Sequence, residues 1–244
     1  PCLPRKPKGR TVLVGAGKAS ALMAQAIERA WDGPLDGLVV TRYGHRVACE
    51  TIEILEAGHP VPDESGVDAS RKMLELARSL GPGDQAICLI SGGGSALLTL
   101  PAEGLSLEDK QSVTNSLLGC GATIHQINAV RKHLSAIKGG RLTEACAPAS
   151  VLTLAISDVP RDDPEVIGSG PSVPDPSTLG DALNVLQHFD IHEPESVIRH
   201  LQQPSNETAK PGGPSWERCR YQLIAKPQQS LEAAAEAGRK VGLN

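Results

Sequence analysis

Short runs of β-branched and aliphatic residues alternate along this chain with longer helical patterns, and this alternation limits the fold to few architectures. Strands separated by helices pair through crossovers, so the pattern predicts a mostly parallel sheet with helices on both faces, a three-layer α/β/α domain. The strand-like runs are residues 11–14, 37–41, 51–55, 86–90, 151–156 and 222–225. The helical patterns are residues 19–31, 65–80, 106–118, 123–137, 182–189 and 230–243.

Capping and breaking residues locate some of the boundaries. Ser106 and Asp109 have the spacing of a capping box that opens a helix. Gly139 and Gly140 are expected to end the helix that begins near residue 123. Residues 202–218 hold prolines and glycines among polar residues, which indicates a surface loop or linker. Residues 1–244 otherwise fit one large α/β domain.

Composition argues against nucleic-acid and membrane partners. The formal net charge is −4 and aromatic residues make up 2% of the chain, so neither a basic surface nor stacking platforms are expected. No apolar run approaches the roughly 18 residues that a membrane helix needs. The six cysteines form no C-x-x-C pair, which favours reduced thiols in a cytoplasmic protein over a zinc site.

A glycine-rich turn, G-A-G-K-A-S, follows the first predicted strand. Gly15 and Gly17 let the backbone approach an anion, and the next helix directs its first N–H groups toward the same place. Lys18 adds a positive charge there. We therefore predict phosphate binding at this turn. A tight strand-to-helix turn with a solvated lysine is the structural alternative.

The same turn is close to a dinucleotide-binding fingerprint. Its third glycine position holds Ser20, and no acidic residue ends the second strand to bind a ribose hydroxyl. Arg42 stands there instead. Because an arginine can bind a 2′-phosphate, an NADPH enzyme is kept as an alternative.

A second glycine-rich loop, S-G-G-G-S, follows the fourth predicted strand. The run of Gly92, Gly93 and Gly94 is costly in chain entropy, which a binding loop explains better than a plain turn. Their N–H groups can surround an anion, and Ser91 and Ser95 add hydroxyl donors. A flexible hinge is the structural alternative. The loop is not of the Walker type, because no G-K-[ST] sequence ends it.

Polar residues in three further places could complete a site. Asn128 and Arg131 lie one turn apart on a predicted helix, with Lys138 roughly aligned, so they could bind a carboxylate or phosphate or form a solvated cationic face. Asp158 follows the strand at 151–156, where an aspartate can orient a hydroxyl or a hydrated metal ion, or simply form a turn. His59 precedes a proline and is expected to be a structural loop residue rather than a catalyst.

Six segments, in order, resemble the class II glycerate 2-kinases, MOFRL-type proteins of which many carry the label hydroxypyruvate reductase. The segments are residues 15–20, 39–45, 58–63, 91–97, 128–135 and 157–160. The resemblance implies a Rossmann-like fold and the phosphorylation of D-glycerate to 2-phosphoglycerate with ATP and Mg²⁺. It also implies an active site in a cleft between two domains.

Site roles follow from the resemblance. Lys18 matches a lysine that is important for activity in the family, and the Asp158 loop lies near the cleft, so both are expected to be catalytic. The resemblance places the second glycine loop and the helix at residues 128–131 on the cleft wall. The expected phosphate-binding residues are Gly15, Gly17, Ser91, Gly92, Gly93, Gly94 and Ser95, and the expected substrate-binding residues are Asn128 and Arg131.

The chain departs from the family in several places. The C-terminal MOFRL domain is missing, so a fragment of a longer protein is expected. Arg161 stands where the family usually has glycine, and residues 225–228 replace a serine-asparagine turn.

Three functions stay open on the sequence: the kinase, an NADPH-dependent hydroxypyruvate reductase, and a non-catalytic module that binds a nucleotide or a sugar phosphate. In each, the partner is a small molecule; for the kinase it is glycerate or a related hydroxy acid. A homodimer is one arrangement that the sequence allows. The kinase prediction requires both glycine loops to lie at the same edge of the sheet.

Overall fold

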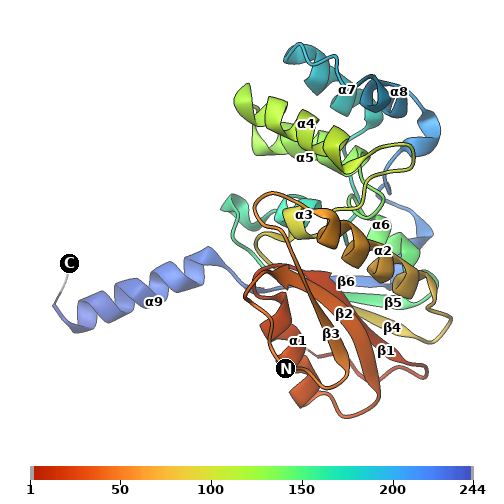
Figure 1. The fold of residues 1–244 in the computed structure, drawn as a ribbon. Helices are drawn as coiled ribbons and strands as arrows, with labels where there is room; N and C mark the ends of the chain where they lie inside the picture. Colours follow the sequence, from red (N-terminus) through yellow and green to blue (C-terminus); the bar gives the residue numbers. More distant parts are fainter. Residues whose placement is uncertain (1–2, 243–244) are drawn as a thin grey trace.

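The computed structural model describes residues 3–242, and within them six strands form one sheet in the order β3-β2-β1-β4-β5-β6 (Figure 1). Every neighbouring pair of these strands runs parallel. The predicted α/β class with a mostly parallel sheet is therefore confirmed. The strands are β1 (Thr11–Ala16), β2 (Leu35–Arg42), β3 (Ile52–Ala57), β4 (Gln85–Ile90), β5 (Ser150–Ile156) and β6 (Cys219–Ala225).

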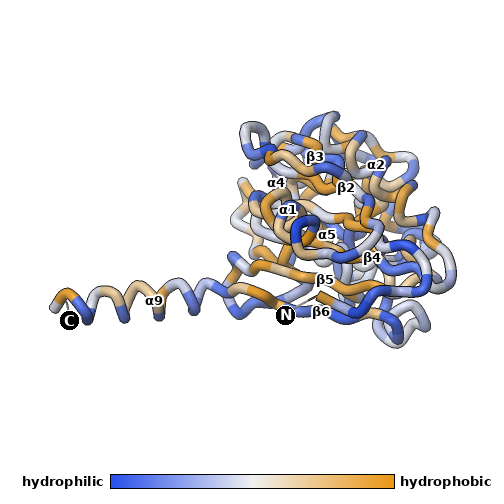
Figure 2. The backbone as a smooth tube through the Cα atoms, turned by 90° about the horizontal axis from the view of Figure 1, so that it is seen from below, coloured by the Kyte–Doolittle hydropathy of each residue, from blue (hydrophilic) through white to orange (hydrophobic). Residues whose placement is uncertain are grey.

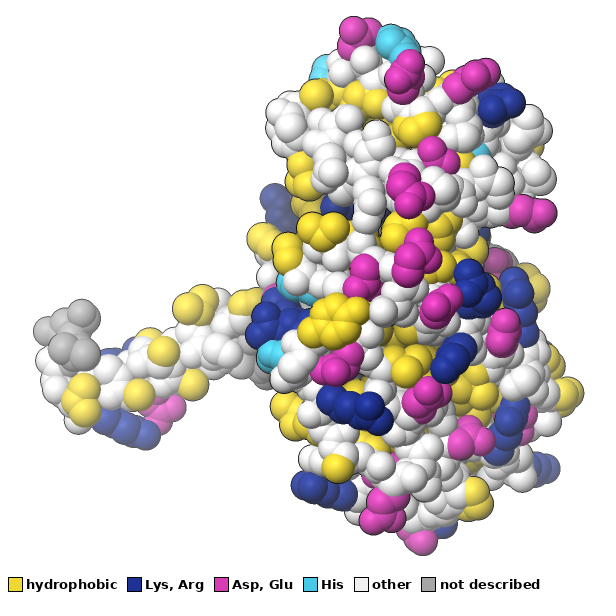
Figure 3. Space-filling model, in the orientation of Figure 1, with side chains coloured by type: hydrophobic (Ala, Val, Ile, Leu, Met, Phe, Trp, Pro, Cys, Tyr) yellow, Lys and Arg dark blue, Asp and Glu magenta, His cyan; other side chains and the backbone are white. Residues whose placement is uncertain are grey.

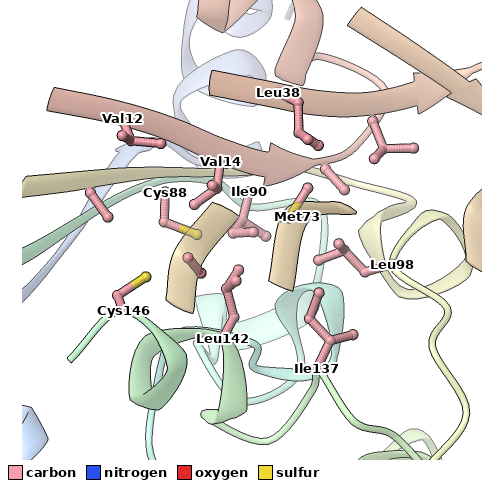
Figure 4. Packing of buried hydrophobic residues seen from close by; sticks show 14 of the residues in the cluster. Val12, Val14, Leu38, Met73, Cys88, Ile90, Leu98, Ile137, Leu142 and Cys146 are labelled. Carbon is pink, nitrogen blue, oxygen red and sulfur yellow. The ribbon is translucent and has the colours of Figure 1, made fainter. Parts of the chain in front are cut away.

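Helices cover both faces of the sheet and complete the three layers. Successive strand residues point to opposite faces, so β1 contributes Leu13 to one core and Val14 to the other. The first core lies under α1 (Ser20–Ala30). The second lies under α2 (Glu64–Arg78) and α6 (Arg141–Ala145). Figure 4 shows that second core, where labelled residues of β1 and β4 meet Met73 of α2 and Leu142 of α6.

Four more helices form a separate layer, which we call the helical cap: α4 (Leu107–Gly119), α5 (Ile124–His133), α7 (Leu179–His188) and α8 (Glu195–Leu201). They lie together at one end of the molecule, away from the sheet (Figure 1). They pack on one another around their own apolar cluster, which includes Val113, Leu117, Ile127, Val130, Leu186 and Val197. The capping box expected at Ser106 and Asp109 is present at the start of α4.

The helix expected over residues 123–137 is shorter than predicted, because α5 ends at His133. The next residues leave the helix to pair with the segment before α4: the amide of Ala136 donates to the carbonyl of Leu100 at 3.0 Å. Gly139 and Gly140, with φ angles of 57° and 82°, do not end α5 but precede α6. Tertiary pairing therefore overrides the helical pattern here.

Residues 202–218 hold two short 3-10 helices, Pro204–Asn206 and Pro214–Arg218. Between them Thr208 and Ala209 are buried, so this segment packs against the domain at its centre. After β6, α9 (Pro227–Lys240) projects away from the domain in both views (Figures 1 and 2) and has no buried residue. The helix expected over residues 230–243 ends earlier, at Lys240: Val241 and Gly242 are turn residues, and residue 243 lies outside the described residues.

Acidic and basic side chains are interspersed on the face that Figure 3 shows. Among residues 3–242, no helix is both long and apolar enough to cross a membrane. Five cysteines in this part of the chain are free thiols.

Candidate active site

The two glycine loops lie side by side at the carboxyl edge of the sheet, as the kinase prediction requires. The amide of Lys18 donates to the carbonyl of Gly92 at 2.9 Å. The amide of Ser91 donates to the carbonyl of Ala16 at 3.2 Å. A Cβ on Gly17 would lie 2.1 Å from the Ser91 hydroxyl oxygen. Gly17 is therefore required for the close approach of the two loops.

The first loop offers a ligand its lysine side chain rather than its backbone. The amide of Gly17 donates to the carbonyl of Val40, and that of Ala19 donates to the Ser91 hydroxyl. The amide of Lys18 is bonded to the second loop as well. Gly15 likewise packs tightly, because a Cβ there would meet the Leu89 carbonyl oxygen at 2.0 Å. These contacts support a role for Gly15 and Gly17 in packing the two loops together. Phosphate binding by these glycines stays a prediction.

The second loop has the free backbone donors. Within residues 3–242, the amides of Gly92, Gly93 and Ser95 have no hydrogen-bond acceptor. Gly93 has a φ of 84°, a left-handed conformation that favours glycine, and Gly94 begins the short helix α3 (Gly94–Leu97). Free amides on a bent backbone of this kind suit an anion such as phosphate.

Lys18, Asp158 and His59 gather around the second loop. The Lys18 ammonium lies 3.9 Å from Oδ2 of Asp158, with the two side chains 44% and 50% exposed. A Cβ on Gly92 would meet Oδ2 of Asp158 at 2.0 Å, and a Cβ on Gly93 would meet the His59 ring at 2.9 Å. The absence of a Cβ at Gly92 and Gly93 thus leaves room for the side chains of Asp158 and His59 above the loop.

His59 is a residue whose place the sequence did not indicate. It comes from the loop between β3 and α2 and lies over Gly93. Burial lowers its pKa below the usual value, and the positive charges of Lys18 and Arg42 lower it further. A neutral imidazole at this point can accept a proton or a hydrogen bond from a hydroxyl group.

Asn128 lies behind the second loop. Its Oδ1 accepts a hydrogen bond from the Ser169 hydroxyl at 2.9 Å, and the Ser169 and Ser95 hydroxyl oxygens lie 2.7 Å apart. Asn128 is 3% exposed and is not among the residues that line the neighbouring cavity. Its contacts support a role in positioning Ser95, whereas direct substrate binding by Asn128 stays a prediction.

A cavity of about 460 Å³ opens beside the second loop, between the sheet layer and the helical cap. Gly93 and Ser95 line one side of it, and α4 and α5 line the other. Its size is in the range of small-molecule sites. The charged residues of its lining are Lys110, Arg131 and Lys138, and no aspartate or glutamate is among them.

Sequence reasoning missed Lys110 and used Lys138 only as an aligned cation. Lys110 is 8% exposed and lies on the same face of α4 as the buried Val113 and Leu117. A lysine within the apolar stripe of a helix was the available signal. Lys138 reaches the cavity from the chain after α5, since that helix ends before it.

The parallel sheet, the paired glycine loops and the cluster at its carboxyl edge define an α/β domain of the Rossmann-like class, with its site where this class binds ligands. The comparison with known families agrees. The chain belongs to the family described as "Domain of unknown function (DUF4147)", whose sequence profile matches residues 3–202.

Curated relatives carry two kinds of name. A protein of Agrobacterium vitis named "Putative hydroxypyruvate reductase" is 53% identical over 99% of this chain and 54% of its own length. The "D-glycerate 2-kinase" of Thermotoga maritima is 43% identical over 99% of this chain and 57% of its own length. The chain thus spans little more than half the length of these relatives.

A solved structure supports the fold. The crystal structure titled glycerate kinase from Thermotoga maritima matches with a TM-score of 0.86 and 44% identity. The match covers 96% of this chain and 56% of that protein. The three-layer architecture described above is therefore shared with a protein named as a glycerate kinase.

Proposed function

We propose that this chain is the nucleotide-binding domain of a glycerate 2-kinase, which transfers a phosphoryl group from ATP to the 2-hydroxyl of D-glycerate and forms 2-phosphoglycerate and ADP. One observation carries the proposal. Lys18 and Asp158 flank a loop with free amides, beside a cavity that bears positive but no negative side chains. The names of the curated relatives and of the matching structure support the same activity.

Each residue of the cluster has a role in this reaction. The amides of Gly92, Gly93 and Ser95 donate to phosphate oxygens, and Lys18 neutralises charge on the transferred phosphoryl group. The hydroxyl oxygen of glycerate attacks the phosphorus as the bond to ADP breaks. His59, neutral because of its lowered pKa, accepts the hydrogen bond of that hydroxyl.

The residues at the site also fit a bound Mg²⁺ ion. This ion usually takes one or two protein carboxylates together with phosphate oxygens, and the half-exposed Asp158 carboxylate supplies one. Within residues 3–242, no cluster of three or more histidine, cysteine or acidic side chains could hold a metal without the nucleotide. When bound, Mg²⁺ would supply charge neutralisation on the phosphates, and Asp158 is the carboxylate that would hold it.

The reductase alternative has less support from the contacts. The pyrophosphate of a dinucleotide needs free amides at the first glycine turn. The amides of Gly17, Lys18 and Ala19 are already bonded. Arg42, the candidate for a 2′-phosphate, donates from Nε to Nε2 of His45 at 2.6 Å.

One assay separates the two activities. The full-length protein receives ATP, Mg²⁺ and D-glycerate in one sample, and NADPH with hydroxypyruvate in a second, while ADP release and NADPH oxidation are followed. We expect ADP release with glycerate and no NADPH oxidation. NADPH oxidation that depends on hydroxypyruvate, without ADP release, would overturn the kinase proposal in favour of the reductase.

The partner that we propose is therefore a small hydroxy acid, and the compartment is the cytoplasm, since the described cysteines are free thiols. Homodimer formation stays a prediction.

A further inference from the structure

The cavity beside the second glycine loop holds an unbalanced set of charges. Lys110, Arg131 and Lys138 line it, and no acidic side chain does. A buried charge is costly to desolvate unless an opposite charge or several hydrogen bonds compensate for it. The question for each cation is therefore which atoms compensate for its charge.

Lys138 is compensated from within the protein. Its ammonium donates to the carbonyl oxygen of Ser95 at 2.8 Å and to that of Leu98. The side chain is 2% exposed, and burial lowers its pKa well below the usual value. Lys138 therefore bonds to the backbone that lines the cavity, and its ammonium keeps little hydrogen-bonding capacity for a ligand.

Arg131 and Lys110 are not compensated in this way. Within residues 3–242, the side chain of Arg131 makes no hydrogen bond or ion pair, although its guanidinium has five N–H donors and is partly buried. The ammonium of Lys110 reaches only the carbonyl of Leu100, at 3.5 Å, the outer limit for such a bond. Buried polar groups are nearly always hydrogen-bonded, so the remaining N–H donors of these two side chains are expected to have an acceptor outside the protein.

The groups that face Lys110 are also positive or neutral. Arg131 of α5 and Arg141 of α6 lower its pKa, after the larger effect of burial, to about 7. Arg141 itself is occupied, because it donates to the backbone carbonyls of Lys132, Asn206 and Glu207. Lys138 and His59 complete the charged or titratable lining of the cavity.

From this geometry we infer that Arg131 and Lys110 form a clamp for the carboxylate of the substrate. The planar fork of Arg131 suits two parallel hydrogen bonds to a carboxylate, and Lys110 adds a point charge beside it. Because the proposed function supplies a hydroxy acid as substrate, the anion assigned here is its carboxylate. With the carboxylate at the clamp, the rest of a small hydroxy acid extends across the cavity toward Gly93 and Ser95.

The walls of the cavity favour a small organic acid over the triphosphate of a nucleotide. Apolar side chains of Val61, Pro62 and Leu118 stand beside the cations. The free amides that suit phosphate belong to the second glycine loop at the other side of the cavity. We therefore assign the carboxylate of the hydroxy acid to the two cations, and the phosphates of the nucleotide to the backbone amides of the second glycine loop.

The test compares D-glycerate with its neutral amide, D-glyceramide, as phosphoryl acceptors for the full-length protein. Arg131→Met and Lys110→Met remove one charge each, and Arg131→Lys keeps the charge but removes the fork. Lys72→Met is the matched control, because Lys72 is an exposed lysine of α2 that pairs with Glu53. Thermal melting of every variant shows whether it is folded.

We expect Arg131→Met to raise the KM for D-glycerate about 10- to 100-fold, the effect of losing hydrogen bonds to a charged group. The KM for ATP should stay within about twofold, and the preference for glycerate over glyceramide should largely disappear. Arg131→Lys should recover only part of this preference. If Arg131→Met does not fold, Lys110→Met and Arg131→Lys give the same comparison.

The outcomes separate the clamp from the kinase activity. If the unaltered protein makes ADP but the variants keep its KM and its preference, the clamp is wrong and the proposed function stands. A rise in the KM for ATP instead would assign these cations to the nucleotide and also overturn the clamp. If the unaltered protein makes no ADP, the proposed function fails, and calorimetric titration with D-glycerate tests the clamp alone. Binding that Arg131→Met abolishes supports it, and absence of binding overturns it.

Discussion

The two sides of the candidate site recognise charge by different means. On the edge of the sheet, backbone amides of the second glycine loop stand beside Lys18 and Asp158, whose side chains are about half exposed. Across the cavity, Lys110 and Arg131 project from the helical cap, and Lys110 is 8% exposed. Charges in water are screened and mobile, whereas buried charges interact strongly and are costly to leave unpaired.

This difference separates the expected effects of mutation. Changes at the sheet edge should act on the transferred group and leave stability nearly unchanged, because exposed ion pairs contribute little to folding. Changes in the cavity should alter stability as well as binding, because the empty clamp is a source of unfavourable energy. The predictions below test this separation, beginning with the largest expected effect.

Lys18→Ala should reduce kcat by about 30- to 10³-fold, a loss of roughly 2–4 kcal/mol of transition-state stabilisation. The reason is that, in the proposed reaction, its ammonium neutralises charge on the transferred phosphoryl group. Steady-state kinetics and thermal melting of the same preparation check this. Lys72→Ala serves as the exposed control. Normal turnover by Lys18→Ala, or loss of its fold, would remove Lys18 from the catalytic residues.

Gly92→Ala should lower kcat about 10- to 100-fold, because the added Cβ would lie 2.0 Å from Oδ2 of Asp158 and must displace that carboxylate. The half-exposed Asp158 can move into solvent, so the melting temperature should change little. Gly119→Ala is the matched control, since a Cβ there meets nothing within 4 Å. Equal activity of the two variants would contradict a catalytic position for Asp158.

Lys110→Met should stabilise the protein by about 1–2 kcal/mol at pH 6, because it removes a buried cation. The folded pKa of Lys110 is about 7, below the usual value of 10.5. Below pH 7 Lys110 is charged in both the folded and the unfolded protein, but its charge is buried only in the folded one. The loss of folding stability caused by this burial is therefore fully present below pH 7. It declines as the pH rises from 7 to about 10.5.

Melting curves of the unaltered protein and Lys110→Met at pH 6 and pH 9.5, each without ligand, measure this effect. The gain in melting temperature should be larger at pH 6. A gain that does not depend on pH would mean that packing rather than charge explains it.

Arg161→Gly should stabilise the fold by roughly 0.5–1 kcal/mol. Arg161 has a φ of 66°, a left-handed conformation that costs an L-residue about 1–2 kcal/mol and glycine almost nothing. Part of that gain is offset by the greater chain entropy of glycine in the unfolded state. Urea unfolding provides the measurement, and Arg161→Ala, which keeps the strain, should give no gain.

The same φ angle suits the glycine that the resemblance to the class II glycerate 2-kinases predicts at position 161. More widely, the sheet edge could be predicted because its constraints are local. A glycine run directly after a buried strand, and a lysine in a strand-to-helix turn, are visible in a few neighbouring residues. The order of the strands then brought the two loops together, as expected.

The cavity could not be predicted in this way, because tertiary contacts create it. α5 ends where residues 134–136 pair with residues 100–102, a contact between distant segments that no helical pattern reveals. Because the helix ends early, Lys138 lies in the lining of the cavity and reaches the carbonyl of Ser95. Lys110 stands within the apolar stripe of α4, but only the packed helical cap shows that this stripe also faces a cavity. His59 lacked any local signal for its place over Gly93.

Lys138 connects the two sides of the site, because it lines the cavity and is hydrogen-bonded to the second glycine loop. Its ammonium holds the carbonyl of Ser95, whose own amide is free on the side of the glycine loop. In the proposed reaction, a phosphate bound by the Ser95 amide would therefore act on the same residue that Lys138 holds beside Lys110 and Arg131. If the proposed reaction holds, we expect occupancy of one side to change the affinity of the other through this shared residue, and by thermodynamic reciprocity each reactant then influences the binding of its co-substrate by the same factor.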